Sequence, residues 1–128
     1  MSKAALDASA ILAFLFNERG AEKLTPEILA AALVSTVNLA EVQTKLVKMG
    51  RSAEDAWIDA HSLGTLAVPY TSEHAMIAGG MITATEPYGL SLGDRSCLAL
   101  AIALNAPVYT TEQSWRNLKV GVPIHMIR

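Results

Sequence analysis

The sequence predicts an α/β protein, namely a three-layer α/β/α sandwich around a central, mainly parallel sheet of four to five strands. Short apolar runs alternate with longer segments in which apolar residues recur every three or four positions. The chain has 128 residues, of which 52% are hydrophobic, so it can bury a sizeable core. We therefore expect one domain, residues 1–128, whose strands are joined by helical crossovers.

The first part of the chain predicts a strand followed by two helices. Ala4–Leu6 is a short apolar run, and apolar side chains return at helical spacing through Ala8–Asn17. Gly20 suits the turn after this helix. The second helix, at about Pro26–Ala32, begins with proline, which is tolerated in a first turn because that N–H has no helical partner.

The middle of the chain predicts two more strands with helices between them. Leu33–Ser35 is a candidate buried strand, and Val37–Met49 carries a core stripe at helical spacing. Ser52, followed three residues later by Asp55, resembles a capping box that starts the next helix. Thr65–Pro69 is then the third strand.

The last third predicts two helices and two strands. Ser72–Thr85 is an expected helix, although it contains two adjacent glycines, and Pro87–Gly93 is an expected loop. The segment CLALAIAL is apolar all round, as in a helix that is packed on both sides. Val108–Thr110 and Ile124–Ile127 are the remaining strands.

Composition excludes several classes of protein. The net charge of −2 lacks the basic footprint of a dedicated nucleic-acid binder, although a metal-dependent enzyme can still act on a polyanion. A single cysteine, Cys97, allows no internal disulfide and no zinc set of Cys and His, and we interpret it as a small core residue. No apolar run reaches the roughly 20 residues that span a bilayer. We expect a cytoplasmic protein that does not enter a membrane.

Four carboxylates follow predicted strands or lie in helices next to them: Asp7, Glu41, Asp94 and Glu112. The carboxyl ends of parallel strands share one edge of a sheet, so acids that are distant in sequence can meet there in one crevice. Clustered carboxylates repel one another unless protons or a cation compensate, and Mg²⁺ favours oxygen ligands while leaving positions for phosphate. The pattern indicates metal-dependent phosphodiester hydrolysis.

Each acid also has a structural interpretation. Asp7 and Asp94 precede apolar helices and could cap them, and Glu112 lies at an expected helix start, where the helix dipole favours negative charge. Glu41 lies mid-helix, four residues before Lys45, and could form an exposed ion pair with it. Glu41 has the weakest structural reason for its position.

The segments LDASAILAFLFNE, VSTVNLAEV and LSLGDRSCLALAIALNAPVYTTEQSW, in this order, resemble the PIN domain, specifically the VapC-type ribonuclease toxins of type II toxin-antitoxin systems. The resemblance covers essentially the whole chain. It implies a Mg²⁺ or Mn²⁺ site formed by Asp7, Glu41 and Asp94, with Glu112 at a fourth position that is commonly aspartate. It also implies RNA hydrolysis by a metal-activated water, leaving a 5′-phosphate and a 3′-hydroxyl.

The same resemblance implies supporting residues and partners. Ser9, Asn38 and Thr110 match polar positions around the family's site, although each could instead satisfy backbone groups. A VapB-type antitoxin and a homodimer are also implied. An antitoxin helix would suit exposed apolar side chains among four residues, namely Phe14, Phe16, Leu46 and Trp57.

An acidic crevice that receives RNA needs cations near it. Arg95 and Arg116 are candidate RNA contacts, with Lys119 closer to plain surface. The histidines (His61, His74 and His125) lack ligand spacing and are expected to have surface or packing roles. Two rival functions remain at this point: a haloacid-dehalogenase-like phosphatase, which needs a second aspartate where Ser9 stands, and a non-catalytic PIN-like domain that binds RNA or a protein partner.

Overall fold

Five short strands form one sheet in a computed structural model that describes residues 2–128. The strands are β1 (Ala4–Leu6), β2 (Ala32–Ser35), β3 (Leu66–Val68), β4 (Val108–Thr110) and β5 (Ile124–Met126). Their order is β3-β2-β1-β4-β5, and every pairing is parallel. In the central strand, Ala5 is in register with Leu33 of β2 and with Val108 of β4. The predicted parallel sheet is confirmed.

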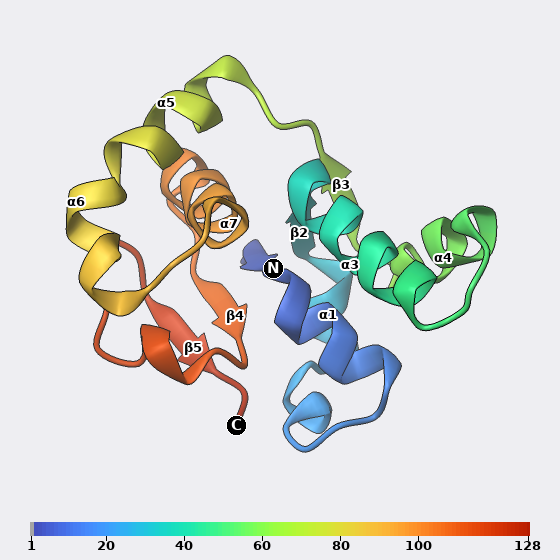
Figure 1. The fold of residues 1–128 in the computed structure, drawn as a ribbon. Coiled ribbons are helices and arrows are strands. Elements are labelled where there is room, and N and C mark those ends of the chain that lie inside the picture. The colour runs from blue at the N-terminus through green and yellow to red at the C-terminus, as the bar shows by residue number, and fades with distance from the viewer. Residues whose placement is uncertain (1) are drawn as a thin grey trace.

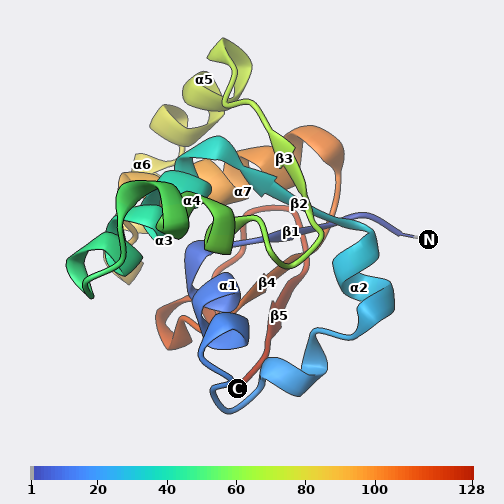
Figure 2. The same ribbon diagram turned by 90° about the vertical axis from the view of Figure 1, so that its right-hand side faces the viewer.

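Helices cover both faces of this sheet (Figures 1 and 2). They are α1 (Ala8–Leu15), α2 (Pro26–Ala30), α3 (Thr36–Lys48), α4 (Ala53–Ala60), α5 (Ser72–Gly80), α6 (Ile82–Thr85) and α7 (Leu92–Leu104), with 3-10 turns at Ala21–Lys23, Glu86–Tyr88 and Gln113–Trp115. Successive strand side chains point to opposite faces. Leu6 and Val34 therefore join a core with α1 to α4, whereas Ala5 and Leu33 join a second core with α5 and α7. The predicted three-layer sandwich is confirmed.

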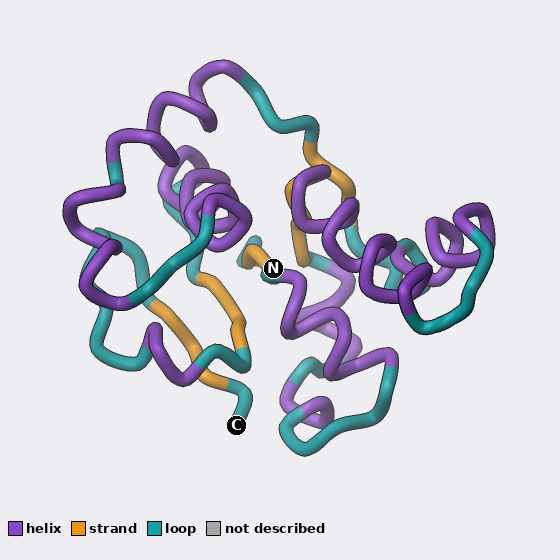
Figure 3. Tube along the Cα trace, in the orientation of Figure 1, coloured by secondary structure: helices purple, strands orange, loops and turns teal. Residues whose placement is uncertain are grey.

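Several helix boundaries differ from those expected (Figure 3). The helix expected at Ser72–Thr85 is divided into α5 and α6, because α5 ends at the second of two adjacent glycines, which disfavour helix. The loop expected at Pro87–Gly93 contains a 3-10 turn and the first two residues of α7. The helix expected to reach Asn17 ends at Leu15, and Asn17 has a positive φ of 51°.

The order of the strands places a crevice at one edge of the sheet. The chain passes from β1 to β2 on one side, whereas β4 lies on the other side of β1. At such a reversal the connections diverge, and ligands of open α/β sheets bind outside the carboxyl ends of the strands. Asp7 follows β1 and Thr111 follows β4, so both segments line this position. Within residues 2–128, no helix combines the length and the apolarity needed to span a bilayer.

Candidate functional site

The Asp7 side chain follows β1 at the carboxyl end of the sheet and is buried, with 2% of its surface exposed. Oδ1 accepts hydrogen bonds from the Ser9 hydroxyl (2.7 Å) and the Ala10 N–H (2.9 Å), and Oδ2 accepts from the Thr110 hydroxyl (2.6 Å). The predicted capping of the first helix is therefore confirmed. Because Thr110 ends β4, the same carboxylate also joins the two strands beside the crevice.

Ser9 and Thr110 connect Asp7 to the loop after β4. The Thr111 N–H donates to Ser9 Oγ (3.0 Å), and the Glu112 N–H donates to Thr110 Oγ1 (3.0 Å). These bonds fix the start of the segment that carries Glu112. The Glu112 side chain is exposed and makes no capping bond to the 3-10 turn that follows it, so the expected helix start is a single 3-10 turn.

Glu41 does not form the exposed ion pair with Lys45 that its spacing allowed; within residues 2–128 the ion pairs are Arg51–Asp59 and Arg128–Glu18. Instead, Asn38 Nδ2 donates to Glu41 Oε1 (2.8 Å) and to the Gly93 carbonyl (3.0 Å). The amide of Asn38 therefore holds the Glu41 carboxylate against the start of α7.

Gly93 leaves the space that this carboxylate occupies. An ideal Cβ built at Gly93 would lie 2.5 Å from Glu41 Cδ and 2.7 Å from Oε1, which no real methyl group could do without displacing the carboxylate. Sequence reasoning missed this residue, because Gly93 and Glu41 are 52 positions apart and meet only where α3 and α7 pack together.

Asp94 lies in the first turn of α7, where its side chain also helps to begin the helix. The Ser91 N–H donates to Asp94 Oδ2 (2.9 Å), and the Asp94 N–H donates to Ser91 Oγ (3.1 Å), which completes a capping box. The N-cap is therefore Ser91, and the expectation that Asp94 itself is the N-cap is wrong.

The carboxylates act on one another electrostatically. Burial raises the pKa of Asp7 to about 7, against the hydrogen bonds from Thr110 and Ser9, and the charge of Asp94 raises it further. Burial also raises the pKa of Glu41, with smaller contributions from the charges of Asp94 and Glu112 that oppose the Asn38 hydrogen bond. The four acids of the sequence analysis therefore share one electrostatic environment.

The buried thiol of Cys97 lies beside this group. Burial raises the pKa of Cys97 well above its usual range, and the charges of Asp7, Asp94 and Glu41 add to the effect. The thiol is therefore neutral, and Cys97 belongs to the core formed with α5 and α7, as expected.

The donor set is chemically suited to a hard cation. Its oxygens belong to carboxylates, and the buried Asn38 Oδ1 has no hydrogen-bond partner within residues 2–128. Over the same residues, no three Asp, Glu, His or Cys side chains stand close enough to enclose one ion together. Mg²⁺ needs only one or two protein carboxylates and takes water for its other ligands, so these residues fit such an ion.

The predicted cationic contacts are partly engaged within the fold. Arg95 is partly buried and donates from Nη1 to the Ala78 carbonyl of α5 (2.9 Å), and among residues 2–128 it forms no ion pair with a carboxylate. Arg116 is exposed and donates to the Gln113 side chain. Their contact with RNA stays a prediction.

The histidines have the packing roles that were expected. His74 is buried and completes a capping box with Thr71 at the start of α5. The His61 ring packs against Trp57, and that of His125 packs against Tyr109.

Comparison with known proteins matches residues 4–120 to the model of the PIN domain family. No curated protein matches the chain. Among solved structures, it resembles VapBC2 from Rickettsia felis bound to a promoter DNA fragment (20% identity, 95% of this chain and 96% of that chain, TM-score 0.70). It also resembles DNA-bound VapBC from Salmonella typhimurium (14% identity, 100% of both chains, TM-score 0.76). A third similar structure is VapC20 from Mycobacterium tuberculosis, a toxin that cleaves the sarcin-ricin loop (16% identity, 93% of this chain and 98% of that chain, TM-score 0.72).

Proposed function

Since the chain belongs to the PIN domain family, we propose that it is a metal-dependent endoribonuclease and the toxin of a toxin-antitoxin pair. The observation that carries the proposal is that burial raises the pKa values of Asp7 and Glu41 near the carboxyl ends of the strands, and that the charge of Asp94 adds to both shifts. The similar structures of the VapBC2 complex and of VapC20, a toxin that cleaves the sarcin-ricin loop, support this function.

Asp7, Glu41 and Asp94 would hold one or two Mg²⁺ or Mn²⁺ ions, and Glu112, which is exposed at the rim, would bind directly or through water. The bound metal would supply an activated water and neutralise charge on the phosphate. Ser9 and Thr110 keep Asp7 in place through their hydroxyl groups, and Asn38 does the same for Glu41. This preorganisation lowers the cost of assembling the site during the reaction.

A protein partner of the VapB type has a suitable apolar surface on α1, α3 and α4. Phe16 is 42% exposed and lines a hollow of about 390 Å³ between the end of α1, the end of α3 and α4. Phe14 and Trp57 are 37% and 40% exposed, whereas Leu46 is 4% exposed, so it forms the floor of the hollow rather than an exposed anchor. An amphipathic antitoxin helix could bury these side chains. Homodimerisation is a further part of the proposal.

The rival phosphatase is less well supported by the geometry. The second aspartate that such an enzyme needs is replaced by Ser9, whose hydroxyl donates to Asp7. Raised carboxyl pKa values such as those of Asp7 and Glu41 are concentrated at functional sites, which favours a catalytic over a non-catalytic domain.

Replacing Asp94 with asparagine tests the proposed function. The amide oxygen can still accept the Ser91 N–H bond, so Asp94→Asn should fold normally. We expect it to lose Mn²⁺-dependent cleavage of single-stranded RNA, while its circular dichroism spectrum and urea unfolding stay close to those of the wild type. Cleavage at the wild-type rate by this variant would refute the assignment.

A further inference from the structure

We propose that Lys45 and Lys48 of α3 bind phosphate groups of the RNA strand on one side of the scissile bond. The inference rests on the ribonuclease function proposed above and adds a substrate-binding surface to it. The sequence analysis named Arg95 and Arg116 as RNA contacts because they are close in sequence to Asp94 and Glu112. Lys45 and Lys48 were not among these candidates, because they are far from both acids in sequence.

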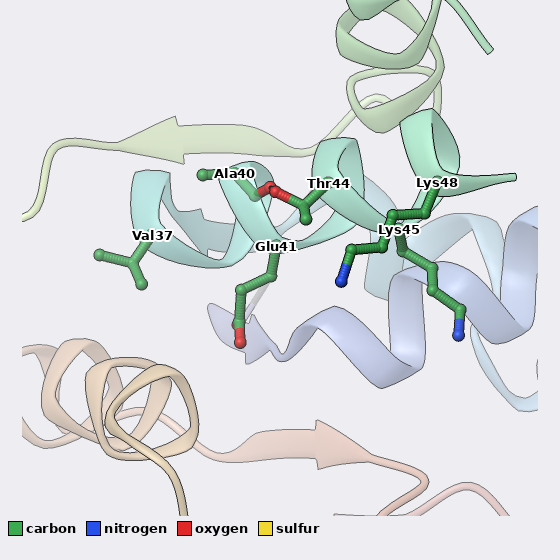
Figure 4. Close-up of a pocket in the computed structure, with 6 residues that line it drawn as sticks. All are labelled: Val37, Ala40, Glu41, Thr44, Lys45 and Lys48. Atoms are coloured by element: carbon green, nitrogen blue, oxygen red, sulfur yellow. The ribbon is translucent and has the colours of Figure 1, made fainter. Parts of the chain in front are cut away.

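A hollow along α3 connects these lysines to the acidic site. It has a volume of about 540 Å³ and is lined by Val37, Ala40, Glu41, Thr44, Lys45 and Lys48. Figure 4 shows the Glu41 carboxylate and both ammonium groups on the same side of the helix. A rise of 1.5 Å per residue places Lys45 about 6 Å and Lys48 about 10.5 Å beyond Glu41 along the axis. The two lysines thus lie about one and two turns of α3 beyond Glu41, and a strand that passes Glu41 along this face would meet both ammonium groups.

The two lysines have no carboxylate partner in the part of the chain that the structure describes. Both are exposed, and Glu41, the acid nearest to Lys45 on this face, is held by Asn38 instead. The ammonium groups therefore carry charge that no ion pair within residues 2–128 compensates. Lysine acts as a mobile point charge toward phosphate, so it can follow an RNA backbone without a fixed geometry.

The proposed contacts of Lys45 and Lys48 add to the predicted RNA contacts of Arg95 and Arg116, whose guanidinium groups are already partly engaged within the fold. The chain has a net charge of −2, and the charges of Asp94 and Glu112 act on Glu41, which lines the hollow, so an approaching RNA is repelled unless local cations compensate. Arg95 uses its guanidinium to bind the Ala78 carbonyl, and Arg116 donates to Gln113. Lys45 and Lys48 stand beside the acids with their ammonium groups available.

The test measures RNA binding separately from cleavage. In the inactive Asp94→Asn background, the double variant Lys45→Gln/Lys48→Gln is compared with its parent by fluorescence anisotropy of a labelled single-stranded RNA at several salt concentrations. The slope of log Kobs against log salt is negative, and each lost phosphate contact reduces its magnitude by about 0.7, so the magnitude should fall by about 1.4 in the double variant. Between 50 and 200 mM salt, the parent should therefore lose about sevenfold more affinity than the double variant.

Matched controls distinguish a specific effect of Lys45 and Lys48 from the effect of removing two positive charges anywhere on the surface. Lys3→Gln/Lys23→Gln removes the same charge from two exposed lysines, one before β1 at the opposite edge of the sheet and one in the 3-10 turn at Ala21–Lys23. This control should keep the parental slope, and Lys45→Arg/Lys48→Arg should restore it. In the active protein, the glutamine pair should raise KM for RNA more than it lowers kcat.

The outcomes distinguish this inference from the proposed function. An unchanged slope together with normal cleavage by the wild type would overturn the lysine surface and leave the ribonuclease in place; in that case the hollow is open to an acidic protein segment. A wild type that never cleaves RNA but shows the lysine-dependent slope would overturn the ribonuclease and keep the surface. A wild type that neither cleaves nor binds RNA would overturn both.

Discussion

Replacing Gly93 with alanine should separate the activity of this protein from its stability. The new Cβ would lie within 2.7 Å of Glu41 Oε1, so the carboxylate must leave its place and its 2.8 Å bond from Asn38 Nδ2 is lost. That bond contributes about 1.5 kcal/mol, whereas alanine favours a helix by up to about 1 kcal/mol over glycine. The free energy of unfolding should therefore change by less than about 1 kcal/mol.

Activity should respond much more strongly. Displacement of a catalytic group by about 1 Å can lower a rate by roughly 100-fold, and we expect at least that loss in kcat/KM for Mn²⁺-dependent RNA cleavage. Gly79→Ala and Gly80→Ala are matched controls, because both glycines lie in α5 and no atom stands within 4 Å of an added Cβ. Both should keep full activity and slightly raise the midpoint of urea unfolding.

A double-mutant cycle identifies the cause of the loss. If the methyl group acts through Glu41, Gly93→Ala should have no further effect on the residual activity of Glu41→Ala. Wild-type cleavage by Gly93→Ala, or full additivity of the two substitutions, would show that the position of this carboxylate does not control the reaction.

Two more predictions concern protons and metal. Burial raises the pKa of Asp7 from 3.8 to about 7, so the folded state binds this proton more tightly than the unfolded state does. In the presence of a chelator, the free energy of unfolding should therefore fall by up to roughly 4 kcal/mol as the pH rises from 4 to 8. Urea unfolding across this range should show the fall in the wild type and a much flatter profile in Asp7→Asn; equal profiles would contradict the assignment to Asp7. Separately, Mn²⁺ at about 100 times its Kd should stabilise the wild type at pH 8 by about 2.7 kcal/mol, with a matching rise in Tm that chelator reverses. The same rise in Asp94→Asn would place the ion elsewhere.

The architecture was predictable because it depends on local patterns. Each strand was predicted as a short apolar run, and apolar residues begin to recur every three or four positions where a helix begins, as at Ala8 and at Thr36. Boundaries were less predictable where two signals compete. Ser91 starts α7 well before its apolar stretch, because a capping box with Asp94 outweighs the low helix propensity of Gly93.

The candidate site was predictable as a set of acids but not as a geometry. Parallel strands bring Asp7 and Thr110 together, so the strand pattern was sufficient to predict their proximity. The direction of Glu41 was not predictable, because its spacing to Lys45 and its spacing to Asn38 are both compatible with a bond on a helix. The Gly93 carbonyl, which also accepts from Asn38, decides between them, and that contact exists only in the folded chain.

The hydrogen bond between Thr110 and Asp7 also has a consequence for synthesis of the chain. It joins residues 103 positions apart, and Thr110 ends the fourth of the five strands. A nascent polypeptide can build β1, β2 and the helices around them, yet half of the crevice is missing until β4 has left the ribosome. Truncated products that end before Val108 therefore lack the loop that carries Glu112, and the contact between Asp7 and Thr110 forms only after β4 has been synthesised.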